Sequence, residues 1–161
     1  IKVEPEIEVQ IDLNVTSYIP DEYISDSNQK IEIYQEIALC KNEKDIQDII
    51  DEIIDRFGNM PTELENLIAI ARIKYLAKSN NIIKIMSKKN AVVFVYESNK
   101  FEKDINEMVK KYGNRIKFSA GVKPMITLEI KEKGEKAILK EVTKFLKDEK
   151  NKNFINSFWR I

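Results

Sequence analysis

The spacing of apolar residues changes near residue 80, from a helical period to the short runs typical of strands. Between Glu43 and Phe57 apolar side chains recur at i, i+3, i+4, i+7, i+8 and i+11, which predicts an amphipathic helix with one buried face. These side chains are Ile46, Ile49, Ile50, Ile53, Ile54 and Phe57. Gly58 follows, and glycine readily adopts the left-handed backbone that ends a helix. Similar patterns predict helices over about residues 28–41 and from Pro61 to about Ser79.

The second half of the chain has a different pattern. Two apolar runs, Ile82–Met86 and Ala91–Tyr96, flank the polar segment Ser87–Asn90 and predict a β-hairpin. Further strands are predicted over residues 115–118 and 125–130, with one helix over residues 101–112 and another from about Gly134. The last helix is expected to bury Ile138, Val142, Phe145 and Leu146.

A leading strand is predicted where Ile7, Val9, Ile11 and Leu13 alternate with polar residues. The expected fold class is therefore α+β: a helical N-terminal half with one leading strand, then a small, mostly antiparallel sheet with flanking helices. Residues 1–148 are expected to form one domain, and residues 149–161 an aromatic C-terminal tail. We expect Phe154, Phe158 and Trp159 of that tail to pack against the domain or a neighbouring molecule.

Several classes of chemistry lack their usual residues. The sequence contains no histidine, and its four glycines form no phosphate-binding motif. We therefore expect no catalytic residue, no cofactor-binding residue and no metal ligand in this chain. A single cysteine and the lack of a long apolar run predict a cytoplasmic protein that does not enter a membrane. Because the chain begins at Ile1, we expect it to be a fragment of a larger protein.

One alternative is an accessory enzyme or magnesium site formed by acidic residues of the 43–57 helix, namely Asp48, Asp51, Glu52 and Asp55. Because these residues occupy the polar positions between the isoleucines, a solvated helix face is the simpler interpretation. Glu52 can also pair with Arg56 one turn later. Asp55 lies in the last turn, where a negative charge opposes the helix dipole, and this unfavourable placement favours a surface that binds a protein.

Charge is distributed unevenly along the chain, although its formal net charge is zero. Residues 1–66 carry 17 acidic and 5 basic side chains, whereas residues 67–161 carry 10 and 22. The two halves either attract each other within one fold or present two partner surfaces of opposite sign. The lysine-rich C-terminal half is an alternative DNA-binding module. However, Glu132, Glu135, Glu141, Asp148 and Glu149 interrupt the lysines, which favours a solvated face.

Three motifs occur in order: Tyr18–Asp26 with the pattern I-P-x-x-Y-I, Lys30–Tyr34, and Asp51–Pro61 with the pattern E-x-x-D-R-F-G-x-x-P. Together they resemble the C-terminal (TRCF) domain of bacterial transcription-repair coupling factor (Mfd). The resemblance is closest over residues 7–75. Lys30 stands where the family usually has arginine, and Gln35 and Glu36 stand where it often has basic residues.

The resemblance implies that the parent protein is an ATP-dependent DNA translocase that contacts double-stranded DNA, releases stalled RNA polymerase and recruits UvrA for nucleotide excision repair. ATP and magnesium would belong to the parent's motor and not to this chain. The resemblance further implies that this domain packs on a UvrB-like module of the same parent chain and masks its UvrA-binding surface. The residues of the family motif that make this contact match Glu52, Asp55 and Arg56.

Overall fold

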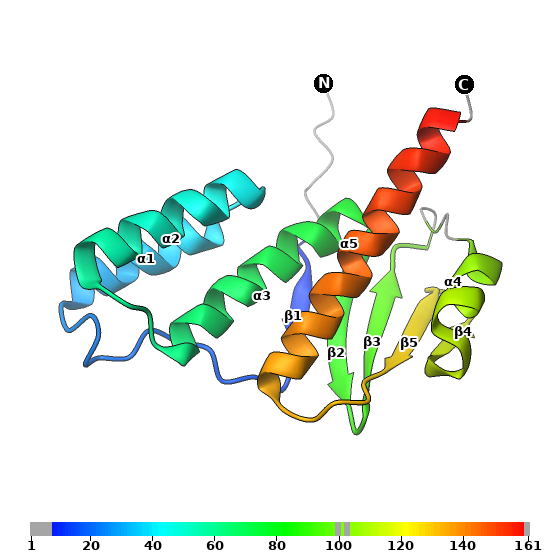
Figure 1. The fold of residues 1–161 in the computed structure, drawn as a ribbon, viewed down its shortest axis with the longest axis horizontal. Coiled ribbons are helices and arrows are strands. Elements are labelled where there is room, and N and C mark those ends of the chain that lie inside the picture. The colour runs from blue at the N-terminus through cyan, green and yellow to red at the C-terminus, as the bar shows by residue number, and fades with distance from the viewer. Residues whose placement is uncertain (1–7, 99–100, 102–103, 160–161) are drawn as a thin grey trace.

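The computed structural model describes the backbone of residues 8–98, 101 and 104–159, and the side chains of these residues as far as Asp148. It has the α+β organisation predicted from the sequence (Figure 1). The N-terminal half contains the short strand β1 (Gln10–Asp12) and three helices, α1 (Ser27–Ala38), α2 (Glu43–Phe57) and α3 (Thr62–Ser79). The C-terminal half contains β2 (Ile82–Lys88), β3 (Ala91–Tyr96), α4 (Ile105–Tyr112), β4 (Ile116–Ser119), β5 (Met125–Glu129) and α5 (Glu135–Trp159).

The five strands form one sheet in the order β1-β2-β3-β5-β4. β1 pairs with β2 in parallel, through Gln10 opposite Lys84, and the other neighbours are antiparallel. The sheet is therefore mostly antiparallel, as predicted. Figure 1 shows α3 and α5 side by side in front of the sheet, while α1 and α2 lie together at the left of the molecule.

Two hydrophobic clusters stabilise the described part of the chain. One lies between the sheet and the helices α3, α4 and α5, and includes Phe94, Phe145 and Leu146. The other lies between α1, α2 and the start of α3, and includes Ile33, Ile53 and Leu64. α3 contributes to both because it has apolar residues on two sides, so this helix joins the two halves.

Helix boundaries follow the capping residues. α2 has the predicted bounds because the Asn42 side chain caps its first turn and Gly58, at φ +86°, ends it. α1 ends at Ala38 and not near Lys41, because Asn42 must be extended in order to cap α2. Similarly, α4 begins at Ile105 and not at Phe101, because Asp104 is its N-cap. Phe101 lies outside the helix and contacts the rings of Tyr96 and Phe118 instead.

The remaining predictions differ from the structure in small ways. β2 continues to Lys88, so the predicted turn over Ser87–Asn90 is reduced to Lys89 and Asn90. In α5, Val142, Phe145 and Leu146 are buried as predicted and Ile138 is partly buried, while the buried Leu139 was not predicted. In the leading strand, Val9 is buried and Ile11 and Leu13 pack on the sheet cluster, but Ile7 lies outside the described residues.

Two predictions about the end of the chain are not tested. The α5 backbone runs through residue 148, where the domain boundary was predicted, and the division into domain and tail stays a prediction. The side chains of Phe154, Phe158 and Trp159 lie outside the described side chains.

None of the helices in the described part of the chain is both long and apolar enough to cross a membrane.

Candidate functional site

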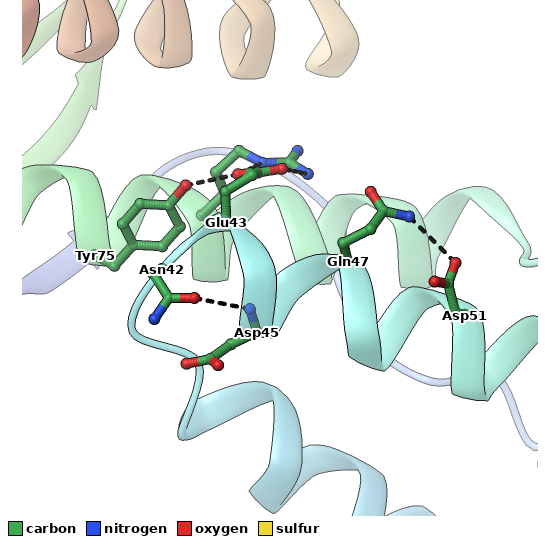
Figure 2. Close-up of polar contacts among 7 residues, drawn as sticks. Asn42, Glu43, Asp45, Gln47, Asp51 and Tyr75 are labelled. Carbon is green, nitrogen blue, oxygen red and sulfur yellow. Dashed lines mark hydrogen bonds and ion pairs between the residues drawn. The ribbon is translucent and has the colours of Figure 1, made fainter.

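The candidate site is the polar face of α2, and the start of this helix is fixed by a set of polar contacts (Figure 2). Glu43 accepts two hydrogen bonds from Arg72 of α3, at 2.9 and 3.0 Å, and one from the Tyr75 hydroxyl at 2.6 Å. Burial favours the neutral form of Glu43, but the hydrogen bonds from Arg72 and Tyr75 and the charges of Arg72 and Lys147 hold its pKa below the usual value. Burial and the bond to Glu43 raise the pKa of Tyr75.

The far end of α2 is fixed by the family motifs themselves. The Tyr23 hydroxyl donates to the carbonyl of Gly58 at 2.5 Å, and the Tyr23 ring contacts Phe57. In the I-P-x-x-Y-I loop the Ile19 amide donates to the Tyr34 hydroxyl at 2.8 Å. The three motifs that carry the resemblance therefore meet in one place and hold the last turn of α2.

The structure brings two of the three predicted site residues together. The Arg56 guanidinium lies 3.3 Å from the Glu52 carboxylate, as expected for an i, i+4 pair, and stacks over the Phe57 ring at 4.9 Å. Asp55 is exposed on the same helix, and among the described residues it has no ion pair. Ile46, Ile49 and Ile53 are buried. Asp55 and Arg56 stay exposed and Glu52 partly exposed, so these polar groups are available to a partner.

Glu36 of α1 is a further member of this face that sequence reasoning noted only as a departure from the family. Its carboxyl shares a hydrogen bond with Glu52, which raises the pKa of Glu36; partial burial and the charges of Glu52 and Glu32 raise the pKa further, and Arg56 opposes them. A shallow depression of about 360 Å³ lies between the two helices and is lined by Glu36, Asp45, Asp48 and Glu52 together with Leu39, Cys40 and Ile49. Residue spacing within one helix does not show which residues of α1 contact α2. The only sequence signal for the contact between Glu36 and Glu52 was that Glu36 stands where the family often has a basic residue.

The acidic residues of α2 were the basis of the alternative magnesium site, which stays a prediction. In the described part of the chain no group of three or more Asp, Glu or Cys side chains is arranged to hold a metal ion. Asp51 instead accepts a hydrogen bond from Gln47 at 3.2 Å (Figure 2). Cys40 packs partly buried against the helical cluster, and burial and the charges of Asp45 and Glu36 raise its thiol pKa.

Comparisons with known proteins agree with the arrangement of motifs. The family model for the TRCF domain matches residues 13–108. A transcription-repair-coupling factor of Rickettsia prowazekii is 35% identical over 137 residues, which cover 84% of this chain and 12% of the relative. One from Bacillus subtilis is 32% identical over 136 residues, covering 82% of the chain and 12% of the relative. The chain thus spans about an eighth of the length of these relatives.

The fold is also that of a solved structure. A crystal structure of the C-terminal domain of transcription-repair coupling factor superposes with a TM-score of 0.76 at 23% identity. The match covers 91% of this chain and 97% of that one. With a family model that matches more than half of its residues, and relatives aligned over most of its length, this chain belongs to the TRCF domain family of transcription-repair coupling factors.

Proposed function

We propose that this chain is a regulatory, non-catalytic domain that packs on a UvrB-like module of its parent protein and masks the module's UvrA-binding surface. The parent would be a cytoplasmic, ATP-dependent DNA translocase that releases stalled RNA polymerase and recruits nucleotide excision repair. The observation that carries the proposal is the polar surface at the end of α2, where Asp55 is exposed and the paired Glu52 and Arg56 side chains are partly exposed.

The α2 face is suited to binding a charged partner reversibly. Glu52 and Arg56 hold each other in position while both side chains stay partly exposed, at 40% and 32%. An exposed pair of this kind contributes little to folding, typically below about 1 kcal/mol. When a partner excludes water, the same charges gain much more from complementary groups across the interface.

The test replaces Glu52, Asp55 and Arg56 together with alanine. The domain should lose less than about 1.5 kcal/mol of stability, because the variant removes a surface ion pair, the contact between Arg56 and Phe57, and the partly exposed contact between Glu52 and Glu36. Its affinity for the separately produced UvrB-like module should fall by roughly 2–5 kcal/mol, because charges on that module are left buried without partners. Calorimetry of binding and thermal unfolding of the domain measure the two quantities.

A matched control replaces Glu65, Glu129 and Lys110 with alanine. These residues are exposed on other elements, and the control removes two negative charges and one positive charge, as the α2 variant does. This control should bind the module as the unmodified domain does. In the parent protein, the α2 variant alone should bind UvrA without RNA polymerase. A folded α2 variant that binds the module normally would show that the contact with the module lies elsewhere.

A further inference from the structure

Three of the carboxylates that interrupt the C-terminal lysines in the sequence, Glu135, Glu141 and Asp148, bind other groups of the domain in the structure. Glu135 accepts hydrogen bonds from the Thr16 amide at 2.8 Å and from the buried Asn66 side chain at 3.2 Å. Glu141 pairs with Arg115 at 3.1 Å, and Asp148 pairs with Lys111 at 2.6 Å. Three negative charges of α5 are thus held on its flanks by groups of the same domain.

The lysines of α5 share the remaining side of the helix. At about 100° per residue, Lys136, Lys140, Lys144 and Lys147 fall within an arc of about 80°, opposite the buried Val142 and Phe145. They form a stripe about 16 Å long, given a rise of 1.5 Å per residue. All four are exposed. Lys147 also lies near Glu43 and lowers its pKa, whereas the other three have no ion pair among the described residues.

The stripe continues beyond the start of α5. The hairpin turn between β2 and β3 lies beside the loop that leads into α5, because the Ile130 amide donates to the Asn90 carbonyl at 2.8 Å. Between them is an open pocket of about 600 Å³ lined by Lys88, Lys89, Lys131 and Lys133, with Glu129 and Glu132 as its two carboxylates. Lysines of the hairpin and of the loop before α5, about 40 positions apart in the sequence, therefore extend the positively charged stripe of α5. We call this surface, Lys88, Lys89, Lys131, Lys133, Lys136, Lys140 and Lys144, the basic face.

We propose that the basic face binds the phosphate backbone of double-stranded DNA without reading its sequence. The formal net charge of the chain is zero, so affinity for a polyanion must come from a local surface and not from the whole molecule. Lysines are suited to phosphate contacts, whereas reading of bases usually needs arginine or amide side chains in a groove, or aromatic rings. Here the face consists of lysines only, three on α5 and four in the hairpin and the loop before α5. Figure 1 shows α5 beside α3. Apart from Glu43 at the start of α2, which lies near Lys147, the acidic side chains of α1 and α2 belong to the helix pair at the left of Figure 1 and would repel DNA on that side.

The experiment measures binding of this chain to a fluorescently labelled 30-base-pair duplex by anisotropy, at several salt concentrations starting near 20 mM. The logarithm of the association constant should fall linearly with the logarithm of salt concentration. Each phosphate that the protein contacts should add about 0.9 to the magnitude of the slope. The variant Lys136→Gln, Lys140→Gln, Lys144→Gln should lower the slope by about 2 to 3 and weaken binding at least tenfold at low salt. Replacement of the same three lysines by arginine should preserve binding.

The control variant Lys110→Gln, Lys117→Gln, Lys123→Gln removes the same charge from exposed positions around α4, β4 and the β4–β5 loop. It should keep the slope and the affinity of the unmodified chain. Equal weakening by the two glutamine variants would show only general attraction, and absence of binding at 20 mM salt would remove the basic face as a DNA site. Displacement of the duplex by poly-glutamate at equal charge concentration would also overturn the proposal, because it would indicate an acidic protein as the partner. None of these results bears on the contact proposed for α2, which uses other residues.

Discussion

At the scale of single residues, Glu43 is where the acidic and basic halves of the chain meet. It binds Arg72 and Tyr75 of α3, and the charge of Lys147 of α5 also acts on it. Lys74 with Glu8 is a second ion pair between the halves within the described residues. The two halves of the chain therefore attract each other at these two places within one fold.

The Glu43 network should make stability depend on pH in the acid range. The folded-state pKa of Glu43 is below the ordinary 4.5, so its contribution is complete above that value and is lost as pH falls through the folded pKa. Glu43→Gln should destabilise the domain by about 0.5–1 kcal/mol at pH 7, a small effect because the Glu43 side chain is 52% exposed. Urea unfolding at pH 7 and at successive values below 4.5 should show this difference shrinking.

Glu129→Gln is the control for that series, since Glu129 is an exposed glutamate at the end of β5 whose side chain accepts no hydrogen bond among the described residues. It should unfold like the unmodified chain at every pH. If Glu43→Gln keeps its full effect at the lowest pH, the network acts through packing and not through charge.

At the scale of elements, the end of α2 depends on one glycine. Gly58 has φ +86° and ψ −162°, a region that other residues rarely adopt, and its carbonyl accepts the Tyr23 hydrogen bond. Sequence reasoning predicted the helix end and the positive φ, because both follow from local residues. It could not predict that the I-P-x-x-Y-I loop, more than 30 residues earlier, supplies the contacting tyrosine.

Gly58→Ala should therefore destabilise the domain by roughly 1–3 kcal/mol. The Cβ of alanine would meet no atom within 4 Å at this position, so the expected loss comes from backbone strain and not from a clash. Gly121→Ala is the control, because its new Cβ would approach only the Lys123 carbonyl, at 3.9 Å, and its φ is outside the left-handed region. Thermal unfolding of the two variants gives the comparison, and equal stability would mean that the chain after α2 relaxes freely.

At the scale of the whole molecule, hydrophobic spacing predicted the helical N-terminal half and the mostly antiparallel sheet of the C-terminal half, because each element buries one face against its neighbours. The contacts of Glu36, Glu135 and Glu141 were not predictable, since their partners come from other elements. Sequence reasoning discounted the C-terminal lysines because it could not show that Glu135, Glu141 and Asp148 bind groups of other elements. Glu52, Asp55 and Arg56 could be identified as candidate partner-binding residues only through the family resemblance. The unfavourable position of Asp55, a negative charge at the negative end of the helix dipole, was supporting evidence.

The parallel pairing of β1 with β2 has a consequence for the order of folding. β2, β3, β5 and β4 join through connections within residues 82–129, whereas β1 meets β2 only after a segment of about 70 residues containing α1, α2 and α3 has been closed. Contacts that close long loops lose more chain entropy before they form, so β1 should pair late. Val9→Ala should then mainly accelerate unfolding, while Val92→Ala, which removes an equally buried valine from the hairpin, should mainly slow folding. Stopped-flow measurements in urea separate the two rates, and a slower folding rate for Val9→Ala would show instead that the N-terminal strand is part of the folding nucleus.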